Sequence, residues 1–335
     1  MKYKTLLFYH YNTINDVKSH IEREIEFCNN LDIRGRIRVC PEGLNVTADG
    51  TEEAINEYIK FIDTSPELHP EHIQPKVQIH FKTGYAEEHE RLPNLSIKAC
   101  KEVVSLDLPK DINKDIKTLK GGKHLTPKEF HEALQQNNDD NNNNNNEEES
   151  GVFNIKHDNK NVLIDVRNLY ETRIGHFDCD NVPLLDPKTR KFSDFTRWID
   201  DNCHNLKNKQ VFAYCTGGVR CERATQYMEY KGIKNVNQLS GGICAYMEEY
   251  PDGGLFRGKN FVYDPRIAVP YAQGKAAEEV VGKCSLCSID YDDYSSQTRC
   301  MICRMLVLVC EACLECKPEE SQQVVCEHCE IHNRG

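Results

Sequence analysis

The feature that most constrains the fold is a short apolar stretch that runs directly into a cysteine. Residues 211–214 (Val-Phe-Ala-Tyr) predict a buried strand, Cys215 follows at once, and a helix is predicted from Cys221 onward. The intervening loop contains Thr216, Gly217, Gly218 and Val219. Such a loop, closing on a helix N-terminus, points successive backbone N–H groups into one concavity and favours an anion there. A cysteine in that position is expected to be a thiolate with a pKa below the usual ~8.5, so Cys215 is the candidate catalytic nucleophile.

Two more side chains at the end of this loop are candidates for the site. Arg220 is expected to direct its guanidinium at the anion, although an arginine on a loop can also simply face solvent. Cys221 is either a second reactive thiol or a residue that packs in the first helical turn, and we favour packing. Four residues separate Cys215 from Arg220, whereas a tyrosine-phosphatase loop needs five. The spacing therefore argues against a phosphatase.

A second predicted strand of this region ends in a charged pair. Residues 161–167 (Asn-Val-Leu-Ile-Asp-Val-Arg) place Asp165 and Arg167 at the carboxyl end of a strand, where ligands bind in open α/β sheets. The two side chains are candidate catalytic groups, and an ion pair at the sheet edge is an equal alternative. Predicted strands alternate with predicted helices here, which is typical of a mostly parallel sheet covered on both faces. We place this α/β domain at residues 124–257.

The first part of the chain has a different pattern, in which two strands follow the first helix. The order is strand, helix, strand, strand, helix, strand, predicted at residues 3–9, 15–31, 35–40, 43–48, 51–62 and 76–81. This order is that of a ferredoxin-like (acylphosphatase-like) α+β domain. We predict that this domain occupies residues 1–105.

The region between these two domains is rich in lysine. Residues 97–128 hold eight lysines against four acidic residues, although the whole chain has a net charge of −11. We predict a basic linker at residues 106–123, which is either a solvated connection or a strip that contacts phosphates. Thr126 and Glu129 then predict a capped helix start. The Asn/Glu-rich residues 137–150 are predicted to be a disordered insertion inside the α/β domain.

The last part of the chain, residues 258–335, is predicted to be an extended segment followed by a cysteine-rich tail. Four Cys-x-x-Cys pairs supply eight thiolates, which suffice for two tetrahedral structural zinc sites. The predicted ligands are Cys284, Cys287, Cys300, Cys303, Cys310, Cys313, Cys326 and Cys329. A cross-braced arrangement would join the first pair with the third and the second with the fourth, but the spacing leaves the pairing open. Iron–sulfur ligation is a less favoured alternative.

The location of the protein is predicted from its cysteines and its lack of long apolar runs. No run of about 18 apolar residues is present, so no membrane contact is predicted. The N-terminal residues lack a secretory pattern, and the paired spacing of the tail cysteines fits metal binding in a reducing compartment. We therefore expect a cytoplasmic protein. No organic cofactor motif is evident, and the sequence leaves the oligomeric state open.

The site motifs resemble those of a rhodanese domain. The matching residues are Asp165, Arg167, Glu171, Gly175, His176 and Cys215, with Gly241 and Gly242 as the late glycine pair. His176 is interpreted as a structural histidine. The resemblance extends to the tRNA uridine-34 hydroxylase family through Tyr214-Cys-Thr-Gly-Gly-Val-Arg-Cys-Glu, Gly258-Lys-Asn-Phe-Val-Tyr-Asp, Gly35-Arg-Ile-Arg-Val, Glu42-Gly-Leu-Asn and the cysteine-rich tail. It covers nearly the whole chain apart from the Asn tract.

The family resemblance implies an enzyme that acts on the anticodon loop of tRNA. It implies conversion of the wobble uridine to 5-hydroxyuridine with molecular oxygen as co-substrate. In the mechanism that we infer, the Cys215 thiolate adds to C6 of uracil and makes C5 able to react with oxygen. The alternatives are a sulfurtransferase that carries a persulfide on Cys215 and a non-enzymatic adaptor whose rhodanese domain only binds.

Overall fold

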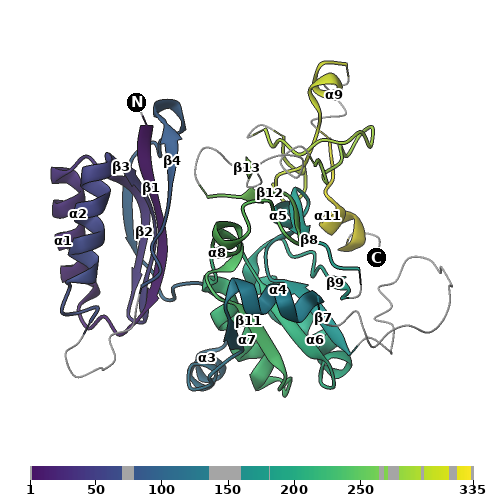
Figure 1. Ribbon diagram of the computed structural model, residues 1–335, viewed down its shortest axis with the longest axis horizontal. Coiled ribbons are helices and arrows are strands. Elements are labelled where there is room, and N and C mark those ends of the chain that lie inside the picture. Colours follow the sequence, from purple (N-terminus) through teal and green to yellow (C-terminus); the bar gives the residue numbers. More distant parts are fainter. Residues whose placement is uncertain are drawn as a thin grey trace. The chain divides into compact units, whose positions relative to one another are not determined.

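The computed structural model describes residues 2–69, 79–135, 160–180, 182–263, 268–270, 279–295, 298–316 and 323–332. The chain forms two compact units (Figure 1). The first unit consists of Met1–Ser105 with Val262–Ile267, and the second consists of Leu106–Phe261 with Ala268–Gly335. The boundary between the two units falls after residue 105.

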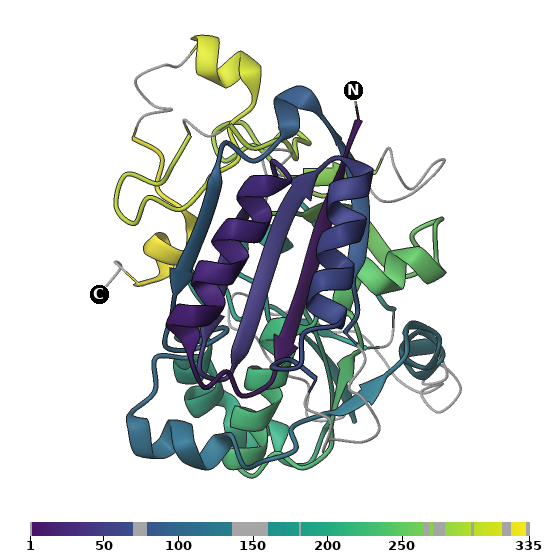
Figure 2. The same ribbon diagram turned by 90° about the vertical axis from the view of Figure 1, so that its left-hand side faces the viewer.

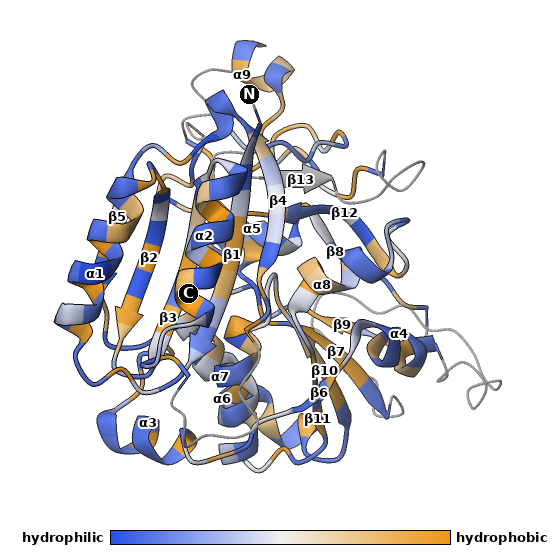
Figure 3. Ribbon diagram, turned by 60° about the vertical axis from the view of Figure 1, so that its left-hand side comes forward, coloured by the Kyte–Doolittle hydropathy of each residue, from blue (hydrophilic) through white to orange (hydrophobic). Residues whose placement is uncertain are grey.

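The first unit is a five-stranded sheet with two helices on one face, as Figure 2 shows. Its elements are β1 (Lys2–Tyr11), α1 (Val17–Asn30), β2 (Arg34–Cys40), β3 (Gly43–Gly50), α2 (Glu52–Asp63), β4 (Lys82–Glu87) and β5 (Leu95–Ala99). The strand order β4-β1-β3-β2-β5 contains the predicted ferredoxin-like arrangement. Side chains of Asp16 and Thr51 cap the two helices by accepting hydrogen bonds from backbone N–H groups. Hydrophobic and hydrophilic residues alternate along β2 because only one of its faces meets the helices (Figure 3).

The predicted strand at residues 76–81 was placed too early. Residues 76–78 lie outside the described residues, residues 79–81 are not in a strand, and β4 begins at Lys82. Ile79 is buried in the hydrophobic core and Phe81 is partly buried against it, so their apolar character reflects packing of a loop. β5 was not predicted, because its sequence Leu-Ser-Ile-Lys-Ala is short and only half-buried; it pairs in parallel with β2.

The second unit is built on a five-stranded sheet with the order β6-β11-β10-β7-β9. All four neighbouring pairs are parallel, as predicted. These strands are β6 (Lys123–Leu125), β7 (Asn161–Asp165), β9 (Leu184–Leu185), β10 (Gln210–Tyr214) and β11 (Val236–Leu239). A small antiparallel sheet joins β8 (Gly175–Phe177), β12 (Phe256–Phe261) and β13 (Ala268–Pro270). Among the described residues, no helix is long and apolar enough to cross a membrane.

Helices cover both faces of the parallel sheet. One core packs the sheet against α3 (Lys110–Ile116), α6 (Phe195–Leu206) and α7 (Val219–Tyr230). The other core packs it against α4 (Pro127–Gln135), α8 (Gly242–Glu249) and the small sheet. Burial on both faces explains why β7 and β10 are almost continuously apolar. The remaining α-helices among the described residues are α5 (Leu169–Thr172) and, in the tail, α9 (Glu311–Cys316) and α11 (Glu327–His332).

The region for which we predicted a basic linker, residues 106–123, is part of the second unit. Leu106 and Ile116 are buried in its core, and Lys123 begins the edge strand β6. The backbone N–H of Gly121 donates to the Glu229 carboxylate at 2.8 Å. Lysines dominate the composition of this segment, yet its few apolar residues are spaced to face the sheet, and burial of those residues anchors it. The helix predicted from Thr126 is confirmed as α4, with the reciprocal bonds of a capping box. The predicted insertion at 137–150 lies outside the described residues.

Candidate active site

Cys215 stands at the carboxyl end of β10, at the entrance of the loop that leads into α7. Helix α7 begins at Val219, two residues earlier than predicted. Gly218 is the N-cap and adopts φ +97°, a conformation that glycine accepts without strain. The turn that results directs the Gly218 N–H at the sulfur of Cys215, 3.1 Å away. The loop therefore has the anion-binding geometry that its sequence predicts.

The surroundings of Cys215 stabilise its thiolate. Burial alone would raise the pKa of Cys215, but the Cys221 thiol, the Arg220 charge and nearby backbone N–H groups lower it to about 5. Cys221 is also fully buried, and burial together with the neighbouring thiolate raises its own pKa well above the ordinary value. Cys221 is thus placed as a hydrogen-bond donor to Cys215, a role that neither of our two predictions for it included.

Arg220 makes a buried ion pair with Glu171. Its two outer nitrogens donate to the two carboxylate oxygens at 2.6 and 2.7 Å, and one of them also donates to the Thr216 hydroxyl at 3.1 Å. Burial by itself would raise the pKa of Glu171, but the Arg220 charge outweighs burial and holds the pKa below its ordinary value. We expected the Arg220 guanidinium to point at the anion. It instead forms a bidentate ion pair with the Glu171 carboxylate, and its positive charge lowers the pKa of Cys215 through space.

The late glycine pair packs against the cysteine loop. A Cβ atom on Gly242 would lie 2.5 Å from the Cys215 carbonyl oxygen and 2.7 Å from the Gly218 nitrogen, so no larger residue fits without a backbone shift. The close approach lets the first N–H groups of α8 donate to the loop, from Ile243 to the Cys215 carbonyl at 2.9 Å and from Cys244 to the Thr216 carbonyl at 3.0 Å. Two helix N-termini therefore hold the loop in place.

Asp165 and Arg167 form a fully buried ion pair, with a shortest distance of 2.7 Å. Arg167 also donates to the Gly175 carbonyl at 2.6 Å, and Asp165 accepts from the hydroxyls of Thr172 and Tyr214. These bonds connect the end of β7 to α5, β8 and β10. The geometry is that of the ion-pair alternative: the pair fixes the segment that carries Glu171.

Two residues of the site were not among those predicted for it from the sequence. Glu171 is the partner of Arg220, and Tyr214 donates to Asp165 at 2.9 Å. The family pattern contained Glu171. However, the sequence around a single glutamate does not indicate that it pairs with Arg220, 49 positions later. His176 contacts the Thr172 carbonyl at 3.1 Å through Nδ1, in keeping with the structural role predicted for it.

The eight tail cysteines gather into two groups of four. Cys284 and Cys287 join Cys310 and Cys313, and the second group consists of Cys300, Cys303, Cys326 and Cys329. The pairing is therefore cross-braced, with each ligand of the second group 16 residues after its counterpart in the first. Within each group all four sulfurs lie within 4.8 Å of one another, which fits a single tetrahedral metal ion.

Backbone N–H groups also point at these sulfurs in the same way in both groups. The N–H of Cys310 donates to the sulfur of Cys284 at 3.3 Å, and that of Cys326 donates to the sulfur of Cys300 at the same distance. Such bonds stabilise thiolate ligands around a metal.

The tail is attached to the helix that carries Glu171. Leu169, at the start of α5, belongs to the same hydrophobic cluster as the tail cysteines. The Tyr294 hydroxyl donates to the Tyr170 carbonyl at 2.8 Å, and Arg173 forms an ion pair with Glu327. The two cysteine groups and the cysteine loop are therefore connected through α5.

Comparison with known proteins matches three successive parts of the chain to family models. Residues 152–249 match the model of the rhodanese-like domain, residues 3–103 that of the UPF0176 acylphosphatase like domain, and residues 257–330 that of the rhodanase C-terminal region. A cysteine loop between a parallel strand and a helix, on a sheet covered on both faces, together with this match defines a rhodanese-domain protein.

Curated relatives identify the particular family of rhodanese-domain proteins to which the chain belongs. The tRNA uridine(34) hydroxylase of Bacillus cytotoxicus is 32% identical over 327 residues, which are 97% of this chain and 82% of that protein. The protein of the same name from Onion yellows phytoplasma is 31% identical, covering 99% of this chain and 89% of its own length. The rhodanese-like domain-containing protein 6 of Arabidopsis thaliana is 39% identical over the whole chain, which spans only 54% of that relative's length. The chain belongs to the tRNA uridine(34) hydroxylase family, whose members are tRNA-modifying enzymes of the rhodanese superfamily.

Proposed function

We propose that this protein hydroxylates the wobble uridine of tRNA to 5-hydroxyuridine, with Cys215 as the nucleophile and molecular oxygen as the co-substrate. The observation that carries the proposal is the buried sulfur of Cys215, which a backbone N–H contacts at 3.1 Å and whose pKa is lowered to about 5. A thiolate at neutral pH can attack carbon, whereas a thiol cannot. Two relatives that cover most of this chain bear the name of this activity.

The chemistry follows from the electronic structure of uracil. Addition of the Cys215 sulfur to C6 breaks the C5–C6 double bond and leaves an enolate with negative charge at C5. Reaction of C5 with oxygen and loss of the sulfur from C6 then give the hydroxylated base. The conversion leaves one oxygen atom on C5 and reduces the other to water, so a reductant must supply two electrons and two protons. The base has to leave the anticodon stack to meet the sulfur.

We propose a distinct role for each of the predicted site residues. Cys215 bonds to the base, and the loop N–H groups with the Arg220 charge stabilise negative charge on sulfur and on the enolate. Glu171 positions Arg220, and Asp165 with Arg167 supports the segment that carries Glu171. This assigns to Asp165 and Arg167 a positioning role in place of the catalytic one that we predicted.

We propose that zinc is the metal of the two cysteine groups and that its role is structural. Four thiolates complete a tetrahedral shell and leave no open position for a substrate. The metal would supply folding free energy to a segment with little core of its own. Metal analysis of the purified protein should find two zinc ions per chain; one ion or none would contradict the assignment.

The test of the proposed function is mass spectrometry of nucleosides from tRNA of cells that make or lack the protein. Cys215→Ala should abolish 5-hydroxyuridine at the wobble position, because it removes the thiolate that attacks C6. Cys203→Ala is the matched control, since Cys203 lies on α6 and bonds to the Asp200 carbonyl. Unchanged 5-hydroxyuridine in the Cys215→Ala strain would refute the proposal.

A sulfurtransferase remains the competing function, because the same loop can hold a persulfide. The Gly218 N–H that contacts the sulfur would then contact the outer sulfur of a Cys215 persulfide. Thiosulfate–cyanide turnover by the purified protein, lost in Cys215→Ala, together with unmodified wobble uridine would favour this function.

A further inference from the structure

The loop that joins Cys300 to Cys303 exposes two large apolar side chains. Met301 and Ile302 are each 53% exposed, although the cysteines on either side of them are mostly buried. Two exposed apolar residues are common on any protein surface and by themselves indicate nothing. Their charged surroundings distinguish this pair.

Arginines from two distant parts of the sequence flank these side chains. The Arg190 Nε donates to the carbonyl of Cys303, 113 positions later, at 3.0 Å. Arg304 follows Cys303 directly and is exposed, and Arg299 on the other side donates to the Arg304 carbonyl at 3.1 Å. In the part of the chain that the structure describes, neither Arg190 nor Arg304 has a carboxylate partner. We call Arg190, Arg299, Met301, Ile302 and Arg304 the knuckle surface.

The knuckle surface is connected to the active site through the loop after β9. β9, β7 and β10 are parallel neighbours, so this loop and Cys215 leave the same carboxyl edge of the sheet. Thr189 is next to Arg190. Its backbone carbonyl accepts a hydrogen bond from the Leu169 N–H at 2.8 Å, and its hydroxyl donates to the Arg167 carbonyl at 3.2 Å. Leu169 begins α5, the helix that carries Glu171. The loop that carries Arg190 and the loop that follows Cys215 therefore lie at the same edge of the sheet.

We propose that the knuckle surface binds the RNA substrate, with Arg190 and Arg304 on phosphates and Met301 and Ile302 against an unpaired base. This inference rests on the proposed function and adds a second contact to it. Guanidinium groups match phosphate geometry, and in single-stranded RNA the apolar face of a base lies within reach of its own phosphate. A double helix also exposes phosphates, but its bases are stacked and their apolar faces are inaccessible. The combination of charge and apolar contact therefore favours an unpaired segment, such as a tRNA loop.

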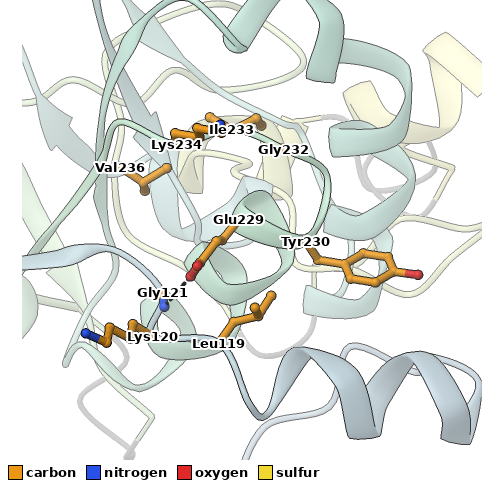
Figure 4. Close-up of a pocket in the computed structure, with 9 residues that line it drawn as sticks. All are labelled: Leu119, Lys120, Gly121, Glu229, Tyr230, Gly232, Ile233, Lys234 and Val236. Carbon is orange, nitrogen blue, oxygen red and sulfur yellow. Dashed lines mark hydrogen bonds between the residues drawn. The ribbon is translucent and has the colours of Figure 1, made fainter.

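A second basic surface lies at the opposite edge of the same sheet and provides a matched control. A pocket of about 550 Å³ lies between residues 119–121 and the turn that joins α7 to β11. Figure 4 shows Lys120 and Lys234 among the residues that line it. Both lysines are exposed, and Lys120 belongs to the lysine-rich segment that we singled out from the sequence. The carboxyl end of a helix repels phosphate, so this surface is the weaker candidate for RNA.

The experiment compares two double variants of the full chain that lose the same charge. Arg190→Gln/Arg304→Gln and Lys120→Gln/Lys234→Gln are titrated with a fluorescent anticodon stem–loop RNA at several salt concentrations. The arginine variant should bind roughly tenfold more weakly, with a salt slope smaller by about 1.4, which corresponds to two phosphates of a single strand. The lysine variant should bind like the unsubstituted protein. Metal content must be the same in both variants, so that loss of the metal groups is excluded.

A third variant tests the apolar contact. Met301→Ser/Ile302→Ser should weaken binding of the stem–loop without changing the salt slope, and should leave binding of a fully paired RNA unchanged. Equal binding by the arginine variant and the unsubstituted protein would overturn the proposal, as would equal losses in both charge variants. Cys215→Ala should bind the RNA normally yet form no product, so a failure of RNA binding at the knuckle surface and a failure of the proposed reaction give different results.

Discussion

Cys215 and the eight tail cysteines carry the same side chain in opposite surroundings. Cys215 is fully buried among hydrogen-bond donors and near a guanidinium, and the positive character that stabilises its thiolate comes from the protein itself. Each tail sulfur has three other sulfurs within 4.8 Å, and four thiolates so close together require a cation from outside. The first arrangement leaves an electron pair available for reaction, whereas the second commits it to a metal.

The two regions also differ in how they fold. The cysteine loop is held by a parallel sheet and two helix N-termini, all of which pack against large apolar cores. The described part of the tail contains short helices, and cysteines make up six of the eleven buried residues in the cluster that it forms with Leu169. The difference predicts that substitution of a metal-ligating tail cysteine acts on folding, whereas substitution of a residue that contacts the Cys215 sulfur acts on the charge of that sulfur.

The largest expected effect is that of a tail ligand. Cys300→Ser should remove one of the two metal ions, because a hydroxyl is a poor zinc ligand, and should unfold the second cysteine group. Structural zinc contributes on the order of 10–16 kcal/mol to such segments, more than their small core can replace. Metal analysis and limited proteolysis measure the effect. Cys316→Ser, an exposed cysteine outside both groups, should keep both ions; the comparison fails if Cys300→Ser keeps them too.

The next effect concerns the ion pair beside the loop. Glu171→Gln leaves the buried Arg220 charge without its counter-charge and should destabilise the protein by about 3–5 kcal/mol. Glu171→Met/Arg220→Met removes both charges and should recover most of that loss. Urea unfolding of the two variants measures this. Equal destabilisation by both would show that packing around the pair, and not its charge, determines the stability.

A smaller effect is expected from the neighbouring thiol. Cys221→Ala removes a donor to the Cys215 thiolate and should raise the pKa of Cys215 above about 5, because hydrogen bonds to charged groups contribute about 1.5–3 kcal/mol. Cys221→Ser keeps a donor and should leave the pKa low. The pKa is read from the ultraviolet absorbance of the thiolate as a difference from Cys215→Ser, which cancels the tail cysteines. A Cys221→Ala variant with the same pKa as the unsubstituted protein would contradict the donor role.

The smallest expected effect is the change in the ultraviolet absorbance of the Cys215 thiolate near neutral pH. Because the lowered pKa of Cys215 is about 5, its thiolate is fully formed above roughly pH 6.5 and is lost as the pH falls through 5. The same absorbance difference should therefore stay flat up to pH 9, whereas a free thiol such as glutathione titrates near ~8.5. A rise between pH 7 and 9 would show that the loop does not stabilise the anion.

The features predicted correctly from the sequence are those that depend on near neighbours. The strand–cysteine–helix order around Cys215, the capped helix at Thr126 and the parallel α/β plan follow from apolar spacing and from caps a few residues apart. The repeated Cys-x-x-Cys pairs likewise predicted the eight cysteines that gather into two groups of four. Such patterns are local, so they are visible in the chain before it folds.

What only the tertiary structure decided is which distant residues meet. The sequence left open how the four Cys-x-x-Cys pairs combine into two groups. It also did not indicate that Arg220 forms an ion pair with Glu171, or that Arg190 donates a hydrogen bond to the Cys303 carbonyl. The lysine-rich residues 106–123 were misjudged for the same reason, because charge counts hide the few apolar side chains that the sheet buries. Periodicity specifies a face and a length, whereas partners are chosen by the packing of elements far apart in the sequence.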